Sequence, residues 1–144
     1  MLTSKLKVIE VFKSIQGEGL YSGLPCVFVR FQGCNLNCPW CDSKYALEPH
    51  SEHYTIKELV RRIKEFKGTK TVVLTGGEPL FRDHGNLIRL CKSLKDDGYQ
   101  IHIETNGTIR VIDELFDLID VWAVSPKISL YPELYTINAK SRDY

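Results

Sequence analysis

A short apolar run leads directly into three cysteines at residues 27–41, VFVRFQGCNLNCPWC. The cysteines are spaced C-x3-C-x2-C, at Cys34, Cys38 and Cys41. Thiolates are soft ligands that suit iron–sulfur clusters and zinc. Three of them on one loop can hold three irons of a cubane cluster and leave the fourth iron open to a small molecule. The stretch therefore predicts a strand followed by a loop that holds a reactive metal cluster.

Zinc is the alternative metal for this loop. A structural zinc site takes four ligands, often as two C-x2-C pairs, and the only such pair is Cys38 and Cys41. His50 and His53 lie close enough in the sequence to complete a Cys/His set. A zinc site therefore stays open as the second interpretation of the same cysteines.

The composition is that of one globular domain, spanning residues 1–144, with 43% hydrophobic and 26% charged residues and a net charge of +1. No apolar run approaches the roughly 18 residues of a membrane span, and near-neutral charge gives no electrostatic case for nucleic acid or a membrane surface. Five cysteines are an odd number, and no signal peptide opens the chain, so we expect a cytoplasmic protein without a disulfide framework. Cys26 and Cys91 lie in apolar patterns and are predicted core residues.

The order of the predicted elements indicates the fold class. We expect strands at residues 7–12, 26–31, 71–75, 99–104 and 120–125, and helices at 85–95 and 111–118. A further helix opens at Thr55 and Glu58, which form a capping-box pattern. Alternating strands and helices favour parallel strands with helices outside. The sequence therefore predicts an α/β fold, a partial β/α barrel with about four βα units.

Polar, glycine-bearing motifs follow the predicted strands at one end. They are the cysteine loop, residues 76–79 (GGEP), 105–107 (TNG) and 125–127 (SPK). In folds of this kind the functional residues lie on loops after the carboxyl ends of the strands. One such motif alone could be ordinary turn chemistry, but four at the same end predict an active site there.

The C-x3-C-x2-C loop and the GGEP segment together resemble the radical S-adenosylmethionine (SAM) superfamily. The resemblance implies a 4Fe–4S cluster on the three cysteines, with SAM bound at the open iron and cleaved to a 5′-deoxyadenosyl radical. It also implies SAM contacts from the rim, at Trp40, Cys41, Asp42, Gly77, Glu78, Asn106, Ser125, Pro126 and Lys127. From the residues alone, Trp40 could equally shield the cluster, and Asn106 and Ser125 could equally cap their loops.

Residues 12–19 (FKSIQGEG), 30–34 (RFQGC) and 41–43 (CDS) narrow the resemblance to the 7-carboxy-7-deazaguanine synthase family. It covers about residues 8–127. It implies a carbon–nitrogen lyase that converts 6-carboxy-5,6,7,8-tetrahydropterin to 7-carboxy-7-deazaguanine with loss of ammonia, on the way to queuosine. SAM would be regenerated, an electron donor such as a flavodoxin or ferredoxin would be needed, and the protein would be a homodimer with no direct contact to nucleic acid or membrane.

Four residues that precede the cysteine loop in the sequence are predicted substrate contacts. Backbone and amide groups of Ile15, Gln16 and Gly17 can pair with the donor and acceptor edge of a pterin. The planar fork of Arg30 could grip the substrate carboxylate. The alternative for Arg30 is a structural ion pair, for example with Glu18.

Two hydroxyl residues complete the predicted site. Thr75, just before the glycines, is expected to contact the substrate, with a hydroxyl in the core as the alternative. The family resemblance implies that Ser43 binds Mg²⁺, since a hydroxyl is an oxygen ligand of the kind that this ion takes. Without the resemblance, Ser43 would be a helix or turn cap.

The carboxyl end is shorter than the superfamily pattern, which has six strands. The tail at residues 128–144 is too short for two further βα units. We therefore expect a shortened or truncated barrel whose last strand is left open, or is covered by a partner. Two other functions stay open from the sequence: a glycyl-radical enzyme activating protein, and a non-catalytic Fe–S or zinc-binding module.

Overall fold

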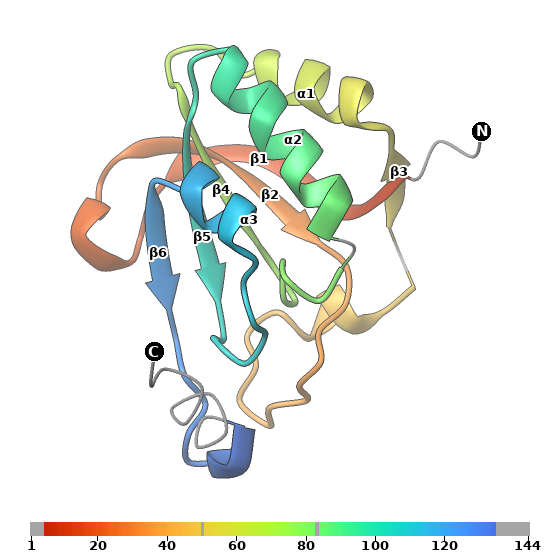
Figure 1. The fold of residues 1–144 in the computed structure, drawn as a ribbon, viewed down its shortest axis with the longest axis vertical. Coiled ribbons are helices and arrows are strands. Elements are labelled where there is room, and N and C mark those ends of the chain that lie inside the picture. The colour runs from red at the N-terminus through yellow and green to blue at the C-terminus, as the bar shows by residue number, and fades with distance from the viewer. Residues whose placement is uncertain (1–4, 50, 83, 135–144) are drawn as a thin grey trace.

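The computed structural model describes residues 5–49, 51–82 and 84–134. Its elements form one mixed sheet with helices over one face (Figure 1). In chain order they are β1 (Leu6–Ile15), η1 (Gly19–Tyr21), β2 (Pro25–Phe31), η2 (Lys44–Leu47), β3 (Glu52–Tyr54), α1 (Ile56–Lys64), β4 (Thr71–Gly76), α2 (His84–Asp96), β5 (Gln100–Thr105), α3 (Asp113–Leu118) and β6 (Val121–Val124). His50 and the end of the predicted tail, 135–144, lie outside the described residues.

The strand order is β3-β1-β2-β4-β5-β6. Strands β2, β4, β5 and β6 are neighbours in that order and run parallel, which confirms the predicted partial β/α barrel. The expectation of parallel strands is wrong for β1, which pairs antiparallel with β2. The reason is the connection: parallel neighbours need a crossover of a dozen or more residues, whereas residues 16–24 form a short turn. The sequence analysis also missed β3, a three-residue edge strand that pairs with the start of β1.

Helix α1 begins with the predicted capping box. The Thr55 hydroxyl accepts from the Glu58 N–H at 3.3 Å, and the Glu58 carboxylate accepts from the Thr55 N–H at 2.8 Å. These bonds satisfy two of the N–H groups that have no partner within a helix. The helix then buries Leu59, Val60 and Ile63 against the sheet. In contrast, α3 begins at Asp113 and not at 111, because Ile112 keeps extended backbone angles.

The two faces of the sheet carry different side chains. We call the helix-covered side the outer face, and it holds the alternate strand residues Val27, Val29, Phe31, Val72, Leu74, Ile101 and Ile103, all of them buried in the main core cluster. We call the other side the inner face. There Cys26, Phe28 and Val73 form a second, smaller cluster, on which the ring of Phe12 stacks with a centroid distance of 5.1 Å.

Both cysteines outside the triplet are core residues, as predicted. Burial raises the pKa of the Cys26 thiol to about 11 and that of Cys91 to about 12. Because reactivity needs the thiolate, neither residue is a candidate nucleophile or ligand near neutral pH. Of the five cysteines, Cys34, Cys38 and Cys41 are therefore the candidate metal ligands.

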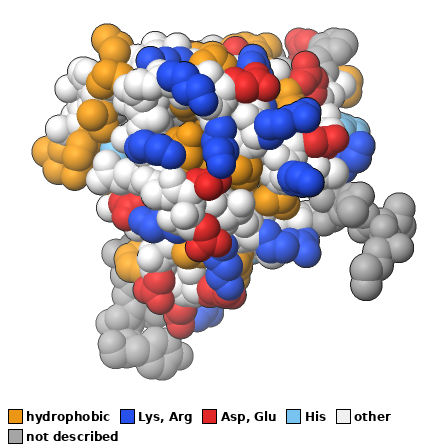
Figure 2. Space-filling view, turned by 90° about the horizontal axis from the view of Figure 1, so that it is seen from above, with side chains coloured by type: hydrophobic (Ala, Val, Ile, Leu, Met, Phe, Trp, Pro, Cys, Tyr) orange, Lys and Arg blue, Asp and Glu red, His pale blue; other side chains and the backbone are white. Residues whose placement is uncertain are grey.

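The surface shows no large region of one charge in the view of Figure 2, where basic and acidic side chains are interspersed. No helix among the described residues is long and apolar enough to cross a membrane.

Candidate functional site

The carboxyl ends of the parallel strands lie together at one end of the sheet. The loops after β2, β5 and β6 lie at the lower edge of Figure 1, with the cysteine loop among them. The sequence prediction that the polar motifs share one rim is therefore confirmed as a matter of geometry.

Cys34 is the cysteine with the most defined surroundings. Its sulfur accepts a hydrogen bond from the Leu36 N–H at 3.3 Å and lies 3.8 Å from the Asn106 side-chain nitrogen. Burial is the main cause that raises its pKa, and the charges of Glu78, Cys38 and Cys41 raise it further. The three thiols are thus close enough to influence one another.

The thiols fit a cluster better than a single ion. Among the described residues, no three or more His, Cys, Asp or Glu side chains converge as ligands of one metal ion. A cubane cluster asks for less convergence, because each thiolate binds a different iron. The amide donors at the Cys34 sulfur are also of the kind that stabilise thiolates in such clusters. His53, the described residue of the zinc alternative, lies exposed on β3 at the edge of the sheet.

The two glycines after β4 are required by the backbone of the cysteine loop. A Cβ atom on Gly76 would lie 2.4 Å from backbone atoms of Phe31, and one on Gly77 would lie 2.1 Å from the Gly33 carbonyl oxygen. Gly76 also has a φ of +133°, which L side chains rarely adopt. The two glycines therefore let the β4 turn press against the start of the cysteine loop, where the Glu78 N–H donates to the Gly33 carbonyl at 2.8 Å.

Glu78 is buried and ties this turn to the end of β5. One carboxylate oxygen accepts from the Leu80 N–H at 3.0 Å and the Thr105 hydroxyl at 2.8 Å, and the other accepts from the Asn106 N–H at 2.8 Å. Burial nevertheless raises its pKa above the usual value for a glutamate. Since Glu78 is only 1% exposed, these bonds make it a structural tie, and its predicted SAM contact stays a prediction.

Asn106 joins the β5 loop to the cysteine loop. Its side-chain nitrogen donates to Asn35 at 3.1 Å, and its oxygen accepts from the Thr108 N–H at 2.9 Å. Asn35 in turn donates to the Thr108 hydroxyl at 2.8 Å. The capping alternative for Asn106 is therefore realised, next to the Cys34 sulfur.

The other predicted SAM contacts lie on exposed parts of the same rim. The Trp40 side chain is 59% exposed, so it covers little in the described structure. Ser125 and Pro126 are exposed after β6, where the Lys127 ammonium donates to the Ser125 hydroxyl at 2.6 Å. The Ser43 hydroxyl donates to Asp42 at 2.8 Å.

Arg30 lies on the inner face at the carboxyl end of β2. Its Nε donates to the Glu10 carboxylate at 2.7 Å, because the two residues are paired across β1 and β2. The alternative of a structural ion pair is therefore realised, with Glu10 as the partner in place of Glu18. A second nitrogen of Arg30 lies 3.4 Å from the Ser43 hydroxyl, and Glu10 also accepts from the Tyr45 hydroxyl at 3.0 Å. The predicted substrate residue Arg30 and the predicted magnesium residue Ser43 are thus neighbours.

Glu104 is the residue of the inner face that the sequence analysis missed. Its two carboxylate oxygens accept from Gln16 at 3.1 Å and from the Thr75 hydroxyl at 2.7 Å, both of which are predicted substrate residues. Strand alternation could have placed Glu104 on the face of the sheet that does not hold the buried Ile101 and Ile103. The bond to Gln16 had no local signal, because the two residues are 88 positions apart.

Together these side chains form a row across the sheet. Glu10 pairs with Arg30, Arg30 pairs with Thr75, and Leu74 pairs with Ile103, so that Glu104 lies beside Thr75. We call Glu10, Arg30, Thr75 and Glu104 the inner-face row. Gln16 reaches it from the loop after β1 and is buried, whereas Ile15 and Gly17 are exposed.

Below this row the inner face is mostly apolar. Its next row contains Phe12, Phe28, Val73 and His102. His102 is buried under the ring of Tyr21, with a centroid distance of 4.9 Å, and its Nε2 has no hydrogen-bond partner. Burial lowers the pKa of His102 below its usual value, so the ring is neutral near pH 7. The row above is therefore bounded on this side by rings and aliphatic groups.

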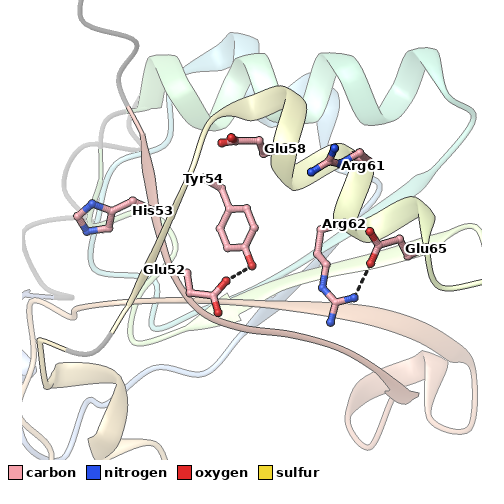
Figure 3. Close-up of a pocket in the computed structure, with 7 residues that line it drawn as sticks. All are labelled: Glu52, His53, Tyr54, Glu58, Arg61, Arg62 and Glu65. Atoms are coloured by element: carbon pink, nitrogen blue, oxygen red, sulfur yellow. Dashed lines mark hydrogen bonds and ion pairs between the residues drawn. The ribbon is translucent and has the colours of Figure 1, made fainter.

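Two hollows among the described residues lie away from the rim, and His53 of the zinc alternative lines one of them. One, of about 220 Å³, lies between β3 and α1 and is lined by Glu52, His53, Tyr54, Glu58, Arg61, Arg62 and Glu65 (Figure 3). Some of its polar groups bond to each other: Arg62 contacts Glu65 at 2.6 Å and the Tyr54 hydroxyl donates to Glu52. Another, of about 400 Å³, lies before β4 and β5, at the end of the sheet opposite the rim.

Comparison with known proteins assigns a family to the part of the chain that contains the rim loops. A model described as the radical SAM superfamily matches residues 28–130. The crystal structure of QueE from Escherichia coli superimposes with a TM-score of 0.70 at 23% identity, covering 96% of this chain and 80% of that one. This likeness confirms the fold.

Curated relatives are named 7-carboxy-7-deazaguanine synthase. That of Aquifex aeolicus is 48% identical over 102 residues, 71% of this chain and 45% of the relative. That of Haemophilus influenzae is 40% identical over 128 residues, 89% of this chain and 56% of the relative. That of Synechocystis is 37% identical and is matched over 100% of this chain and 70% of the relative. The chain thus spans about half the length of the first two relatives.

Proposed function

The chain belongs to the 7-carboxy-7-deazaguanine synthase family of the radical SAM superfamily, and from this premise we propose that it converts 6-carboxy-5,6,7,8-tetrahydropterin to 7-carboxy-7-deazaguanine with loss of ammonia. The reaction would make it a carbon–nitrogen lyase of queuosine biosynthesis. One observation carries the substrate assignment: the inner-face row sets a cation, a hydroxyl and a carboxylate in line beside the cysteine loop.

Cys34, Cys38 and Cys41 are the residues we assign to the 4Fe–4S cluster, and the rim loops are those we assign to SAM. Bound there, cluster and SAM would supply the radical chemistry that removes a hydrogen atom from the substrate. The protein's part is to hold the loops in one arrangement. Glu78 and Asn106 do this by bonding the ends of β4 and β5 to each other and to the cysteine loop.

The inner-face row matches the polar ends of the substrate. Neighbouring strands are about 4.8 Å apart, so the backbones at Arg30 and Glu104, two strands apart, are separated by roughly 10 Å. A bicyclic pterin with a carboxylate on its second ring has about this length. Its pyrimidine edge presents two N–H donors side by side, for which a carboxylate is the matched acceptor. We therefore assign the pyrimidine edge to Glu104 and the substrate carboxylate to Arg30.

Thr75 and Gln16 orient Glu104 in this arrangement. Each donates to one of its oxygens, which fixes the plane of the carboxylate and leaves lone pairs for the pterin. In the same way Glu10 holds the Nε of Arg30, while one terminal nitrogen lies 3.4 Å from the Ser43 hydroxyl. The polar groups are therefore aligned before the ligand binds, which lowers the cost of ordering them.

Magnesium is assigned to Ser43, with Asp42 as the second oxygen ligand that the chain offers there. The support is position, since the Ser43 hydroxyl lies beside both Asp42 and Arg30. A cation there would offset the carboxylate charge of the substrate, with water and substrate supplying the rest of the shell. We further propose a cytoplasmic homodimer that takes its electron from a flavodoxin or ferredoxin.

An anaerobic product assay tests the function. The protein is reconstituted with iron and sulfide, reduced, and given SAM, Mg²⁺ and the tetrahydropterin, and the mixture is read by mass spectrometry. The proposal expects 7-carboxy-7-deazaguanine without matching consumption of SAM. Cleavage of SAM with the pterin untouched would refute the substrate and favour a protein-activating role. Zinc in place of iron and sulfide would refute the radical mechanism.

A further inference from the structure

The Arg82 guanidinium packs against the cysteine loop and forms no ion pair with any of the described residues. A Cβ atom on Gly33 would lie 2.3 Å from an Arg82 terminal nitrogen and 3.2 Å from its Cζ, so the guanidinium occupies space that only a glycine leaves. It therefore lies within about 8 Å of the Cα atom of Cys34, since neighbouring Cα atoms are about 3.8 Å apart.

The charge of Arg82 is not compensated among the described residues. Within residues 5–49, 51–82 and 84–134, its buried Nε has no hydrogen-bond partner, and the guanidinium lies over the ring of Phe81 at 5.8 Å from the centroid. Burial lowers the pKa of the group. Leaving a partly buried cation without an anion costs free energy, so such a group points to a negative partner.

The cluster assigned to this loop would supply a negative charge near Arg82. Three thiolates and four sulfides outweigh the charge of the irons, so the cluster is negative, and one added electron makes it more negative. A nearby cation in a poorly solvated position favours the form with the larger negative charge. The protein charge around a cluster is one of the determinants of its reduction potential.

We propose that Arg82 raises the reduction potential of the cluster held by Cys34, Cys38 and Cys41. The guanidinium stabilises the charge of the electron that an external reductant delivers. This inference rests on the cluster assignment of the proposed function and goes beyond it, because no SAM or pterin contact is involved. In this proposal Arg82 acts on the cluster through its charge and is not a catalytic residue.

The test is a redox titration of the reconstituted protein without SAM. Wild type and Arg82→Gln are titrated with dithionite in the presence of mediators, and the reduced cluster is followed by electron paramagnetic resonance. At a fixed potential we expect roughly tenfold less reduced relative to oxidised cluster in Arg82→Gln, a shift of about 59 mV to more negative potential for a one-electron couple. Arg82→Lys keeps the charge and is expected to keep most of the wild-type potential.

Arg61→Gln is the matched control, since it removes the same charge from an exposed position on α1. It is expected to leave the potential unchanged. Equal potentials in wild type and Arg82→Gln, at equal iron and sulfide content, would overturn the proposal. So would loss of the cluster in both Arg82→Gln and Arg82→Met, because the side chain would then be needed to build the loop. A wild-type protein that takes up no iron would instead refute the proposed function itself.

Discussion

The outer and inner faces of the sheet are built from alternate residues of the same strands, yet they differ in kind. On the outer face, Val29, Leu74 and Ile103 are fully buried under helices. On the inner face, their neighbours Arg30, Thr75 and Glu104 are polar and bonded across strands. The outer side chains gain free energy by leaving water, about 25 cal/mol per Å². The inner ones are held in place by hydrogen bonds, which add little net stability.

The comparison teaches that stability and ligand recognition are separated by strand alternation. A substitution at one position should therefore change the free energy of unfolding, and one at the next position should change ligand binding. The predictions below ask whether this separation holds.

The largest expected effect is on the outer face. Leu74→Ala deletes a fully buried side chain and is expected to lower the free energy of unfolding by about 3 kcal/mol, as large-to-small core substitutions do. Thr75→Val, at the next position of β4, keeps a similar volume and is expected to cost less than about 1 kcal/mol. Chemical denaturation of both variants measures the difference. Equal losses would show that the two faces are not separated.

On the inner face, Arg30→Ala is expected to weaken pterin binding at least tenfold, or about 1.4 kcal/mol, and to leave SAM affinity unchanged. Its ion pair with Glu10 is partly exposed and contributes little to stability. Calorimetric titration with each ligand provides the measurement. An equal loss of SAM and pterin affinity would remove Arg30 from the substrate site.

Ser43→Ala is expected to have a smaller effect, confined to the metal. The variant should need several-fold more Mg²⁺ for half-maximal activity, since it loses one oxygen ligand. Its iron and sulfide content should equal that of the wild type, because the Ser43 hydroxyl contacts Arg30 and Asp42, neither of which is assigned to the cluster. An unchanged Mg²⁺ profile would contradict the assignment.

The smallest expected effect concerns His102 in the apolar part of the inner face. Because burial lowers its pKa below 6.5 in the folded protein, the unfolded chain takes up a proton first as the pH falls below 6.5. The free energy of unfolding should therefore decrease over that range. His102→Phe is expected to reduce this dependence, as measured by denaturation at a series of pH values. An identical pH slope in both proteins would argue against it.

Much of this arrangement was predictable from the sequence. The alternation of strands and helices indicated the barrel, and the motifs after the strands indicated that the cysteine loop shares a rim with residues 76–79, 105–107 and 125–127. Residues 27–31 are apolar on both faces apart from Arg30, so hydrophobicity alone could not separate outer from inner side chains. Glu104 was missed for a related reason, since its role depends on partners from β4 and from the loop after β1. Contacts of that range follow from the strand order and leave no local pattern.

The most direct test of the account is pterin binding to Glu104→Gln, measured by calorimetry on reconstituted protein with SAM present. An amide turns a donor toward the donor edge of the pterin, so we expect binding to weaken at least tenfold, about 1.4 kcal/mol. Iron content, SAM affinity and the free energy of unfolding should stay near the wild-type values. Unchanged pterin affinity would contradict the claim that the inner-face row binds the substrate.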